Sequence, residues 1–465
     1  MKYSRSLGLA ILIFSGVAGA LMWAPYNVWI IAPIYFGVMF HYARSAKTWR
    51  SAFGVAWTMA FLANIFAYGW LAHPFSFIGA PMWQAGLAVG AFSAFLALYV
   101  GFAGIAAKRG TFAFAAALAL GEWIRGWLFT GFPWNPVAAI WSGIPIVMQS
   151  LSLVGTYGLS FLTVYVFAAR RDKVYLVVAL PVVIFGYFRM GAVEPSGVKV
   201  RLVNLASERP LNVDASNFFK QILLSKGDGW EDIDLFVWSE SASKFDPTID
   251  PAAATLLAEA NNAKSALVLG FNRYEIHEGG YDVYNALGVA SRRGMEVVYD
   301  KRHLVPFGEY VPLRWLLKFG KFTEGIRDFS AGEGARFIEI LGRKVAPLIC
   351  YEIIFPGLRL PRDVAYILTI SNDVWFGANG KAQHFALAKL RAVEEGVPVA
   401  RVANSGISAV ISPYGIASET LAGQGILDVA IPLRLARTLF SYTGNYLVIT
   451  VLGMALFVLY RKRKK

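Results

Sequence analysis

Long apolar runs fill the first 192 residues, and they limit the possible fold more than any other feature. A helix needs about 20 mostly apolar residues to cross the hydrocarbon core of a bilayer. Eight runs approach that length, and a long stretch of ordinary soluble composition separates the seventh from the eighth. The predicted spans are 6–23, 27–43, 52–72, 82–106, 112–130, 145–169, 174–192 and 439–460. A hydrophobic fraction of 56% with only 16% charged residues agrees with a membrane protein.

Basic residues indicate on which side of the membrane each loop lies, because cytoplasmic loops keep Lys and Arg and short exported loops lose them. Fifteen basic residues and one acid, Asp172, lie in alternate loops and at the two ends, and they account for the whole net charge of +14. The basic residues are Lys2, Arg5, Arg44, Lys47, Arg50, Lys108, Arg109, Arg170, Arg171, Lys173 and 461–465. The pattern predicts cytoplasmic termini and an exported segment 193–438. It also argues against nucleic-acid binding, since the charge is a topology signal and not a patch on one face.

The predicted organisation has three parts. Residues 1–193 form a seven-helix transmembrane bundle, 194–436 an exported domain, and 437–465 a last transmembrane helix with a basic cytoplasmic tail. The first 20 residues also have the basic start, apolar run and small-residue end of a cleavable signal peptide. Their apolar run is longer than the usual core of about 7–15 residues, so we expect the helix to be retained.

Short runs rich in β-branched residues alternate with helix-like stretches in the exported segment. Several of these runs are apolar on both faces, which is typical of strands in a sheet that helices cover. The predicted strands are 198–206, 234–239, 265–271, 345–350, 364–371 and 397–411, and the predicted helices include 250–262 and 380–395. This alternation predicts an α/β layered domain.

Three reactive side chains follow predicted strands, where loops bring functional groups together in such folds. They are Glu240, the single cysteine of the chain, Cys350, and Lys301, which follows the strand-like run MEVVYD at 295–300. A thiol attacks a carbonyl as the thiolate, so it needs a base or a neighbouring cation. Glu240 is a candidate base, and Lys301 with the backbone N–H after Cys350 can hold the negative oxygen of a tetrahedral intermediate.

Each of these residues also has a structural explanation when it is taken alone. A lone cysteine is most often a small buried hydrophobic residue. An acid after a strand is most often a helix cap or a solvated loop residue. A lysine beside an arginine, such as Lys301 beside Arg302, is by default a charged residue on the surface. The sequence contains no HExxH, no paired Cys/His cluster, no GxSxG and no Walker motif, so we expect neither a metal nor a cofactor.

Longer motifs around these residues resemble the carbon–nitrogen hydrolase, or nitrilase, superfamily, whose members use Glu, Lys and Cys in that chain order. The motifs are VWSES around Glu240, YDKRHLVPFGEYVPL around Lys301 and Glu309, ICYEIIFPG around Cys350, and SNDVWFG at 371–377. A further motif, EWIRGWLFTGFPWNP at 122–136, lies in the membrane part. Over nearly its full length the chain resembles the apolipoprotein N-acyltransferase family of bacterial inner membranes.

The resemblance implies a nitrilase-like αββα catalytic domain in the periplasm and a ping-pong reaction. A phospholipid donates a fatty acyl group to Cys350, and the resulting thioester acylates the N-terminal amine of a diacylglyceryl-cysteine in an apolipoprotein. Glu240 is then the general base, Lys301 the oxyanion stabiliser and Cys350 the nucleophile. We expect the protein to act as a monomer without a cofactor.

The resemblance also assigns supporting residues. Glu309 matches the second glutamate beside the lysine, and Tyr351 and Glu352 match the two residues after the nucleophile. Asn285, in YDVYNALGV, matches a motif position and is a candidate for substrate binding. One departure lies after the first strand, where family members commonly carry a tryptophan: the stretch 200–228 contains none.

Two features outside the motifs agree with a lipid substrate. Residues 311–326 interleave Trp, Leu and Phe with Arg and Lys, a pattern that suits either the membrane interface or a lid helix packed on its own domain. Trp375 and Phe376 either line an acyl pocket or fill the core.

Two other functions also fit the sequence. One is a membrane-anchored amidase or acyl hydrolase that releases the acyl group to water. The other is a transporter with an exported binding domain, which predicts charged or broken membrane helices. Ionisable residues in the spans are few, chiefly Glu122, Arg125 and Arg189.

Overall fold

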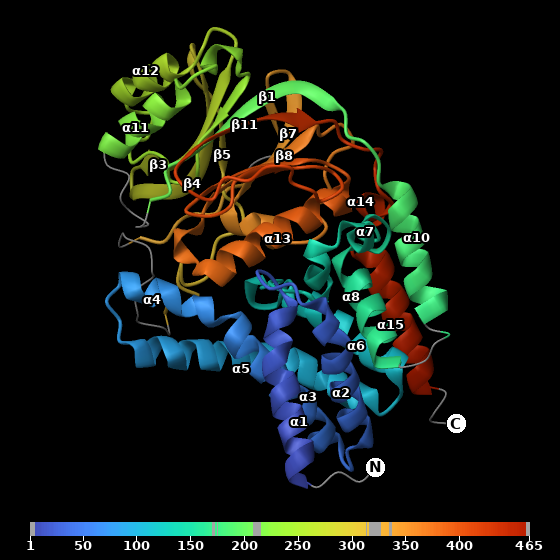
Figure 1. Ribbon diagram of the computed structural model, residues 1–465. Coiled ribbons are helices and arrows are strands. Elements are labelled where there is room, and N and C mark those ends of the chain that lie inside the picture. The colour runs from blue at the N-terminus through green and yellow to red at the C-terminus, as the bar shows by residue number, and fades with distance from the viewer. Residues whose placement is uncertain are drawn as a thin grey trace.

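The computed structural model describes residues 5–169, 173, 175–207, 215–312, 314–315, 327–333 and 337–461. A helical part occupies the lower half of Figure 1 and a layered β part the upper half, and the C-terminal helix returns to the helical part. Most of the predicted interface segment 311–326 lies outside the described residues. So do several basic residues used to predict the topology: Lys2, Arg170, Arg171 and 462–465.

Each predicted apolar run contains a helix. The principal helices are α1 (Arg5–Ala18), α2 (Ala32–Ser45), α3 (Trp49–Ala67), α5 (Met82–Ala107), α6 (Thr111–Arg125), α8 (Leu151–Ala169), α10 (Leu180–Arg189) and α15 (Tyr446–Arg461). Among the described residues, α5 and α8 are long and apolar enough to cross a membrane, and α3 makes a third if it is counted with the segment Gly69–Phe77, which bends away from it by 57°. The other helices are shorter, so the count of eight spans stays a prediction.

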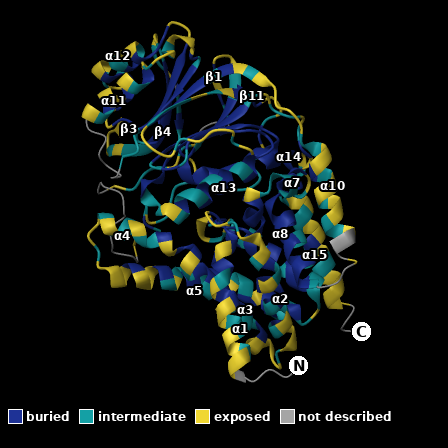
Figure 2. Cartoon of the chain, viewed as in Figure 1, coloured by how far each residue is buried: buried dark blue, intermediate teal, exposed yellow. Residues whose placement is uncertain are grey.

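Large apolar side chains lie on the outer faces of these helices. Figure 2 shows exposed residues along α1 and α5. Phe14 of α1 is 80% exposed, Met82 of α5 77% and Phe188 of α10 79%. Exposed apolar surface of this extent marks contact with lipid or with another protein. It agrees with the bilayer surroundings that the apolar runs predict.

Two sheets form the β part. One has the strand order β11-β1-β2-β3-β4-β5 and the other β10-β9-β8-β7-β6. The first contains β1 (Pro195–Asn204), β2 (Leu235–Val237), β3 (Ala266–His277), β4 (Gly280–Ser291), β5 (Gly294–Asp300) and β11 (Gly425–Pro432). The second contains β6 (Ile338–Ile340), β7 (Arg343–Ile349), β8 (Tyr366–Asn372), β9 (Val399–Asn404) and β10 (Ala409–Ile411). β1, β2 and β3 run parallel, as do β7, β8 and β9, and the remaining pairs are antiparallel.

The two sheets pack face to face with helices outside them, which makes four layers. Val200 and Val237 of the first sheet share one core with Ile349 and Leu368 of the second. Helices α11 (Ala215–Ser225) and α12 (Pro251–Ala260) cover the outer face of the first sheet. On the outer face of the second sheet, α13 (Ala378–Glu395) lies between that sheet and the helical part. The predicted αββα layering is therefore the observed one.

Most predicted elements of this domain match observed ones, with one correction. The range 397–411 is two antiparallel strands, β9 and β10, and not one strand, because the chain reverses at 405–408. Strands β4, β6 and β11 and helix α11 were not predicted. β11 alternates exposed with less exposed positions along part of its length, and the first half of β4 is exposed or half-buried, so neither is a run that is apolar on both faces.

Candidate active site

Strands of both sheets bring the predicted residues together at their carboxyl ends. Glu240 lies three residues beyond β2, and Cys350 directly follows β7. The approach of β3 to Glu240 requires a glycine, because a Cβ on Gly270 would lie 2.6 Å from the Cα of Glu240. Lys301 follows β5, and its N–H donates to the carbonyl oxygen of Asn285 in β4 at 2.8 Å. Strand ends thus fix the main chain of each predicted catalytic residue.

Cys350 sits in a strained turn between β7 and the short helix η8 (Cys350–Ile354). Its φ of 51° is left-handed, which costs a residue with a side chain about 1–2 kcal/mol. The side chain is buried. Such strain persists only where surrounding contacts determine the conformation, and it gathers at functional sites.

Four buried polar side chains form a closed network beside the thiol. Asn285 Nδ2 donates to Glu240 Oε1 and to Glu309 Oε1, both at 2.7 Å. Lys301 Nζ donates to the same two oxygens, at 3.4 Å and 3.0 Å. The N–H of Asn372 donates to Glu240 Oε2 at 2.7 Å, and the N–H of Val305 to Glu309 Oε2 at 2.8 Å. Both carboxylates are held at both oxygens, so neither can turn away from the lysine.

Charge and burial set the protonation of the two key groups in opposite ways. Burial and then the negative charge of Glu240 raise the pKa of the Cys350 thiol well above its ordinary value, while Lys301 acts against them. Burial alone would lower the pKa of Lys301, but the charges of Glu309 and Glu240 outweigh it and raise that pKa. At neutral pH the site therefore holds a neutral thiol, which needs a base, beside a lysine that stays an ammonium.

Glu352 joins the loop that carries Lys301 to the turn that carries Cys350. Its Oε1 accepts from the N–H groups of Arg302 and His303 at 2.9 Å and 3.1 Å, and its Oε2 accepts from the N–H of Ile349 at 2.7 Å. The Tyr299 hydroxyl donates to the same carboxylate at 3.0 Å. A buried carboxylate with this set of donors acts as a clamp between two segments.

Tyr351 joins the turn to the helical part. Its hydroxyl donates to the carbonyl oxygen of Gly131 at 2.7 Å, within the segment 122–136 that the sequence singled out. His303 lies against the same segment, with Nε2 2.8 Å from the carbonyl oxygen of Thr130. The predicted supporting residues Glu352 and Tyr351 thus attach the turn at Cys350 to the loop that carries Lys301 and to the helical part.

Trp375 and Phe376 lie at the boundary between the β part and the helical part. The ring of Phe376 is 4.9 Å from that of Trp70 and 5.2 Å from that of Trp134, and Trp375 meets Phe77 at 5.6 Å. Both residues are only half-buried. This packing agrees with the interpretation that both side chains fill the core, and their place in an acyl pocket stays a prediction.

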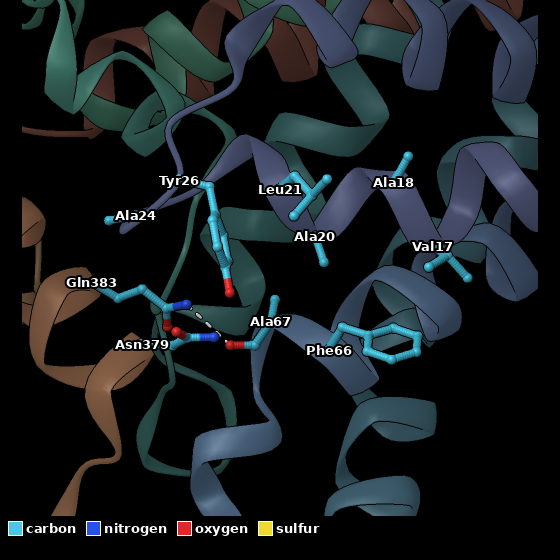
Figure 3. Close-up of a pocket in the computed structure, with 10 residues that line it drawn as sticks. All are labelled: Val17, Ala18, Ala20, Leu21, Ala24, Tyr26, Phe66, Ala67, Asn379 and Gln383. Carbon is cyan, nitrogen blue, oxygen red and sulfur yellow. Dashed lines mark hydrogen bonds between the residues drawn. The ribbon is translucent and has the colours of Figure 1, made fainter.

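A separate cavity of about 250 Å³ opens beside this boundary (Figure 3). Val17, Leu21 and Phe66 give it an apolar end, and Tyr26, Asn379 and Gln383 give it a polar end. None of the predicted site residues lines it.

One buried group at the site was missed from the sequence. His384 of α13 places Nε2 3.2 Å from the carbonyl oxygen of Cys350 and Nδ1 2.9 Å from Asp373 Oδ1. Arg401 holds the other oxygen of Asp373 at 2.6 Å. Asp373 belongs to the motif SNDVWFG, whereas the five histidines of the chain are scattered and His384 lies in none of the motifs, so only the aspartate could be singled out from the sequence.

Comparison with known families first gives the class of the β part. The carbon–nitrogen hydrolase model matches residues 149–439, and the apolipoprotein N-acyltransferase N-terminal domain model matches residues 15–169. The predicted nitrilase fold is thereby confirmed. A solved carbon–nitrogen hydrolase superfamily protein of Xanthomonas campestris is 21% identical, with a TM-score of 0.39 over 55% of this chain and 96% of that chain.

Full-length relatives give the particular family. The apolipoprotein N-acyltransferase of Rickettsia typhi is 30% identical over 96% of this chain and 96% of its own length. That of Agrobacterium fabrum is 36% identical over 82% of this chain and 80% of its own length. The chain belongs to the apolipoprotein N-acyltransferase family, as its motifs indicated.

Proposed function

We propose that this chain transfers a fatty acyl group from a phospholipid, through a thioester on Cys350, to the N-terminal amine of diacylglyceryl-cysteine in apolipoproteins. The observation that carries the proposal is the buried network of two carboxylates, an amide and an ammonium beside a neutral thiol. In a family named for N-acylation of apolipoproteins, this network is suited to acyl transfer.

The first half-reaction loads the enzyme. Glu240 accepts the thiol proton as the sulfur of Cys350 attacks the ester carbonyl of the phospholipid. The oxygen of that carbonyl becomes an oxyanion, which the Lys301 ammonium and the N–H of Tyr351 stabilise. Collapse breaks the bond to the glycerol oxygen, and Glu240 returns the proton to that oxygen. A lysophospholipid leaves, and the acyl group stays on sulfur.

The second half-reaction uses the same groups in reverse. The lipoprotein amine attacks the thioester carbonyl and loses a proton to Glu240, and the thiolate of Cys350 leaves and is reprotonated. Glu309 keeps Lys301 charged and in place at 3.0 Å during both halves. Asn285 bridges the two carboxylates and so keeps the base turned toward the site. Its predicted contact with substrate is part of this proposal.

The proposal places the chain in the bacterial inner membrane with eight spans and both termini in the cytoplasm. Residues 1–193 are the membrane bundle, 194–436 the periplasmic catalytic domain, and 437–465 the last span and tail. The alternating basic residues support this topology. Apolar surroundings keep water from the thioester, and we propose that Trp375 and Phe376 help to shield it. We expect a monomer.

The test is to measure lysophospholipid release by the purified protein with and without a diacylglyceryl-cysteine peptide. We expect one turnover without the acceptor and continuous turnover with it, each released lysophospholipid matching one N-acylated peptide. Cys350→Ser is the matched control and should give neither. Continuous release that ignores the peptide would instead establish a membrane-anchored acyl hydrolase.

A further inference from the structure

His384 is buried completely, yet the reaction described above gives it no role. Its Nε2 lies 3.2 Å from the main-chain oxygen of Cys350, and this contact joins α13 to the turn at Cys350. We propose that His384 is a positioning residue that aims the oxyanion donor of Tyr351. The proposal deepens the proposed function and rests on it for the identity of the reaction.

The planar peptide bond between Cys350 and Tyr351 links the contact of His384 to the direction of the oxyanion donor. The carbonyl of Cys350 and the N–H of Tyr351 belong to one peptide unit, and in a trans peptide they point in opposite directions. A group that fixes the oxygen therefore fixes the direction of the N–H. That N–H belongs to the first turn of η8, where amides have no intrahelical acceptor and can serve a ligand. The left-handed φ of Cys350 persists only while surrounding contacts hold the turn, and the contact with His384 adds to those of Glu352 and Tyr351.

The surroundings of His384 hold its ring in place. Asp373 Oδ1 lies 2.9 Å from Nδ1 and also accepts from the Ser371 hydroxyl at 2.6 Å. Arg401 ties down the second oxygen of Asp373 at 2.6 Å, and the ring of Trp134 stacks on the imidazole with centroids 5.3 Å apart. Every one of these groups is buried. Contacts with the strand ends and with the helical part therefore hold the imidazole in place.

The geometry distinguishes this role from that of a base in a Cys–His pair. A base must reach the thiol proton, whereas the described contact of Nε2 is with the main-chain oxygen. Glu240 already stands close enough for its charge to raise the pKa of the thiol. Loss of His384 should then impair steps that build an oxyanion and spare reactions that need only the thiolate.

The experiment compares two conservative variants in the full-length protein. The proposal takes Nε2 as the donor to the Cys350 oxygen, with Nδ1 facing Asp373 and Arg401. Gln can place its amide nitrogen near the position of Nε2 and so keeps a donor there, whereas Asn reaches only the position of Nδ1 and loses it. Acylation by p-nitrophenyl butyrate forms an oxyanion, and alkylation by iodoacetamide does not. Both rate constants are taken from the kinetic phase of the folded protein in one preparation, so that their ratio does not depend on how much of the protein is folded. Neither probe needs phospholipid or lipoprotein, so the outcome is independent of the substrates named above.

We expect the ratio of acylation to alkylation to fall about 10²-fold in His384→Asn, as for a misplaced catalytic group, and to stay near wild type in His384→Gln. The pH profile of alkylation should be unchanged in both variants. An equal fall of acylation and alkylation would assign His384 to thiol ionisation and overturn the proposal. An unchanged ratio in His384→Asn, or equal loss in the two variants, would overturn it as well.

Discussion

Replacing Glu240 by Gln separates two effects of a single carboxylate. As the proposed base, Glu240 accepts the thiol proton, and a positioned base contributes about 10²–10⁴ in rate. That factor corresponds to about 3–5 kcal/mol of barrier, at about 1.4 kcal/mol for each factor of ten. We therefore expect thioester formation by Glu240→Gln to fall by that factor.

The charge of Glu240 has the opposite effect on the thiol itself. Because that charge raises the pKa of Cys350, removing it should lower the pKa. Lys301 should stay charged in the variant: at an effective dielectric constant of about 20, its attraction to Glu240 at 3.4 Å is about 5 kcal/mol, and that to Glu309 at 3.0 Å is about 5.5 kcal/mol. Glu309 alone is then enough to keep Lys301 an ammonium. This cation continues to favour the thiolate form of Cys350.

The variant should thus react faster with iodoacetamide at a given pH while it forms the thioester more slowly. The assay follows alkylation of Cys350 by mass across the alkaline range, next to the burst of lysophospholipid. Glu309→Gln is the matched control, since it removes an equal charge but keeps the base, and its alkylation midpoint should move less. An alkylation midpoint that stays or rises in Glu240→Gln, or a burst rate within tenfold of wild type, would refute the reasoning.

Three further substitutions test the supporting contacts. Glu352→Gln puts an amide NH₂ against a buried N–H in either orientation, so we expect a loss of about 1–3 kcal/mol, visible as a lower thermal unfolding midpoint; an unchanged midpoint would argue against the clamp. Tyr351→Phe removes one hydrogen bond to Gly131 and should cost about 1 kcal/mol in the same measurement, with a drop above about 3 kcal/mol indicating a larger role. Gly270→Ala places a Cβ 2.6 Å from the Cα of Glu240 and should slow the burst, whereas Gly423→Ala meets nothing within 4 Å and should not; equal rates in the two variants would contradict the packing argument.

The main outline of the catalytic domain could be predicted because it depends on local signals. Strands that are apolar on both faces showed where the sheets lie, and their ends located Glu240 and Cys350. The strand-like run at 295–300 located Lys301. The structure brings these three together with Asn285 and Glu309. Their roles in catalysis stay predictions.

Contacts between distant segments could not be predicted from these patterns. His384 lies on a helix whose apolar stripe indicates only that one face is buried, and its partner Cys350 is 34 residues away. Gln383, next to it, accepts from the indole of Trp134 at 2.8 Å across 249 residues. Which buried polar residue meets which partner is decided by how α13 packs between the second sheet and the helical part, and hydrophobic periodicity does not contain that information.

In the membrane part, the lengths of the helices could not be predicted from the apolar runs. Apolar runs located the helices, but the bend after α3 and the break between Thr443 and Tyr446 before α15 leave several helices shorter than the runs. Tight turns depend on a few residues such as Gly155, whose φ of 63° interrupts α8. Run length therefore overestimates helix length wherever one run contains a turn.

The central claim is that Cys350 carries the acyl group, and the intact mass of the protein purified from its membrane tests it most directly. We predict an added fatty acyl mass that hydroxylamine removes, that disappears when a diacylglyceryl-cysteine peptide is added, and that is absent from Cys350→Ser. Acyl transfer to the peptide by Cys350→Ser, or an adduct that persists in that variant, would contradict the account.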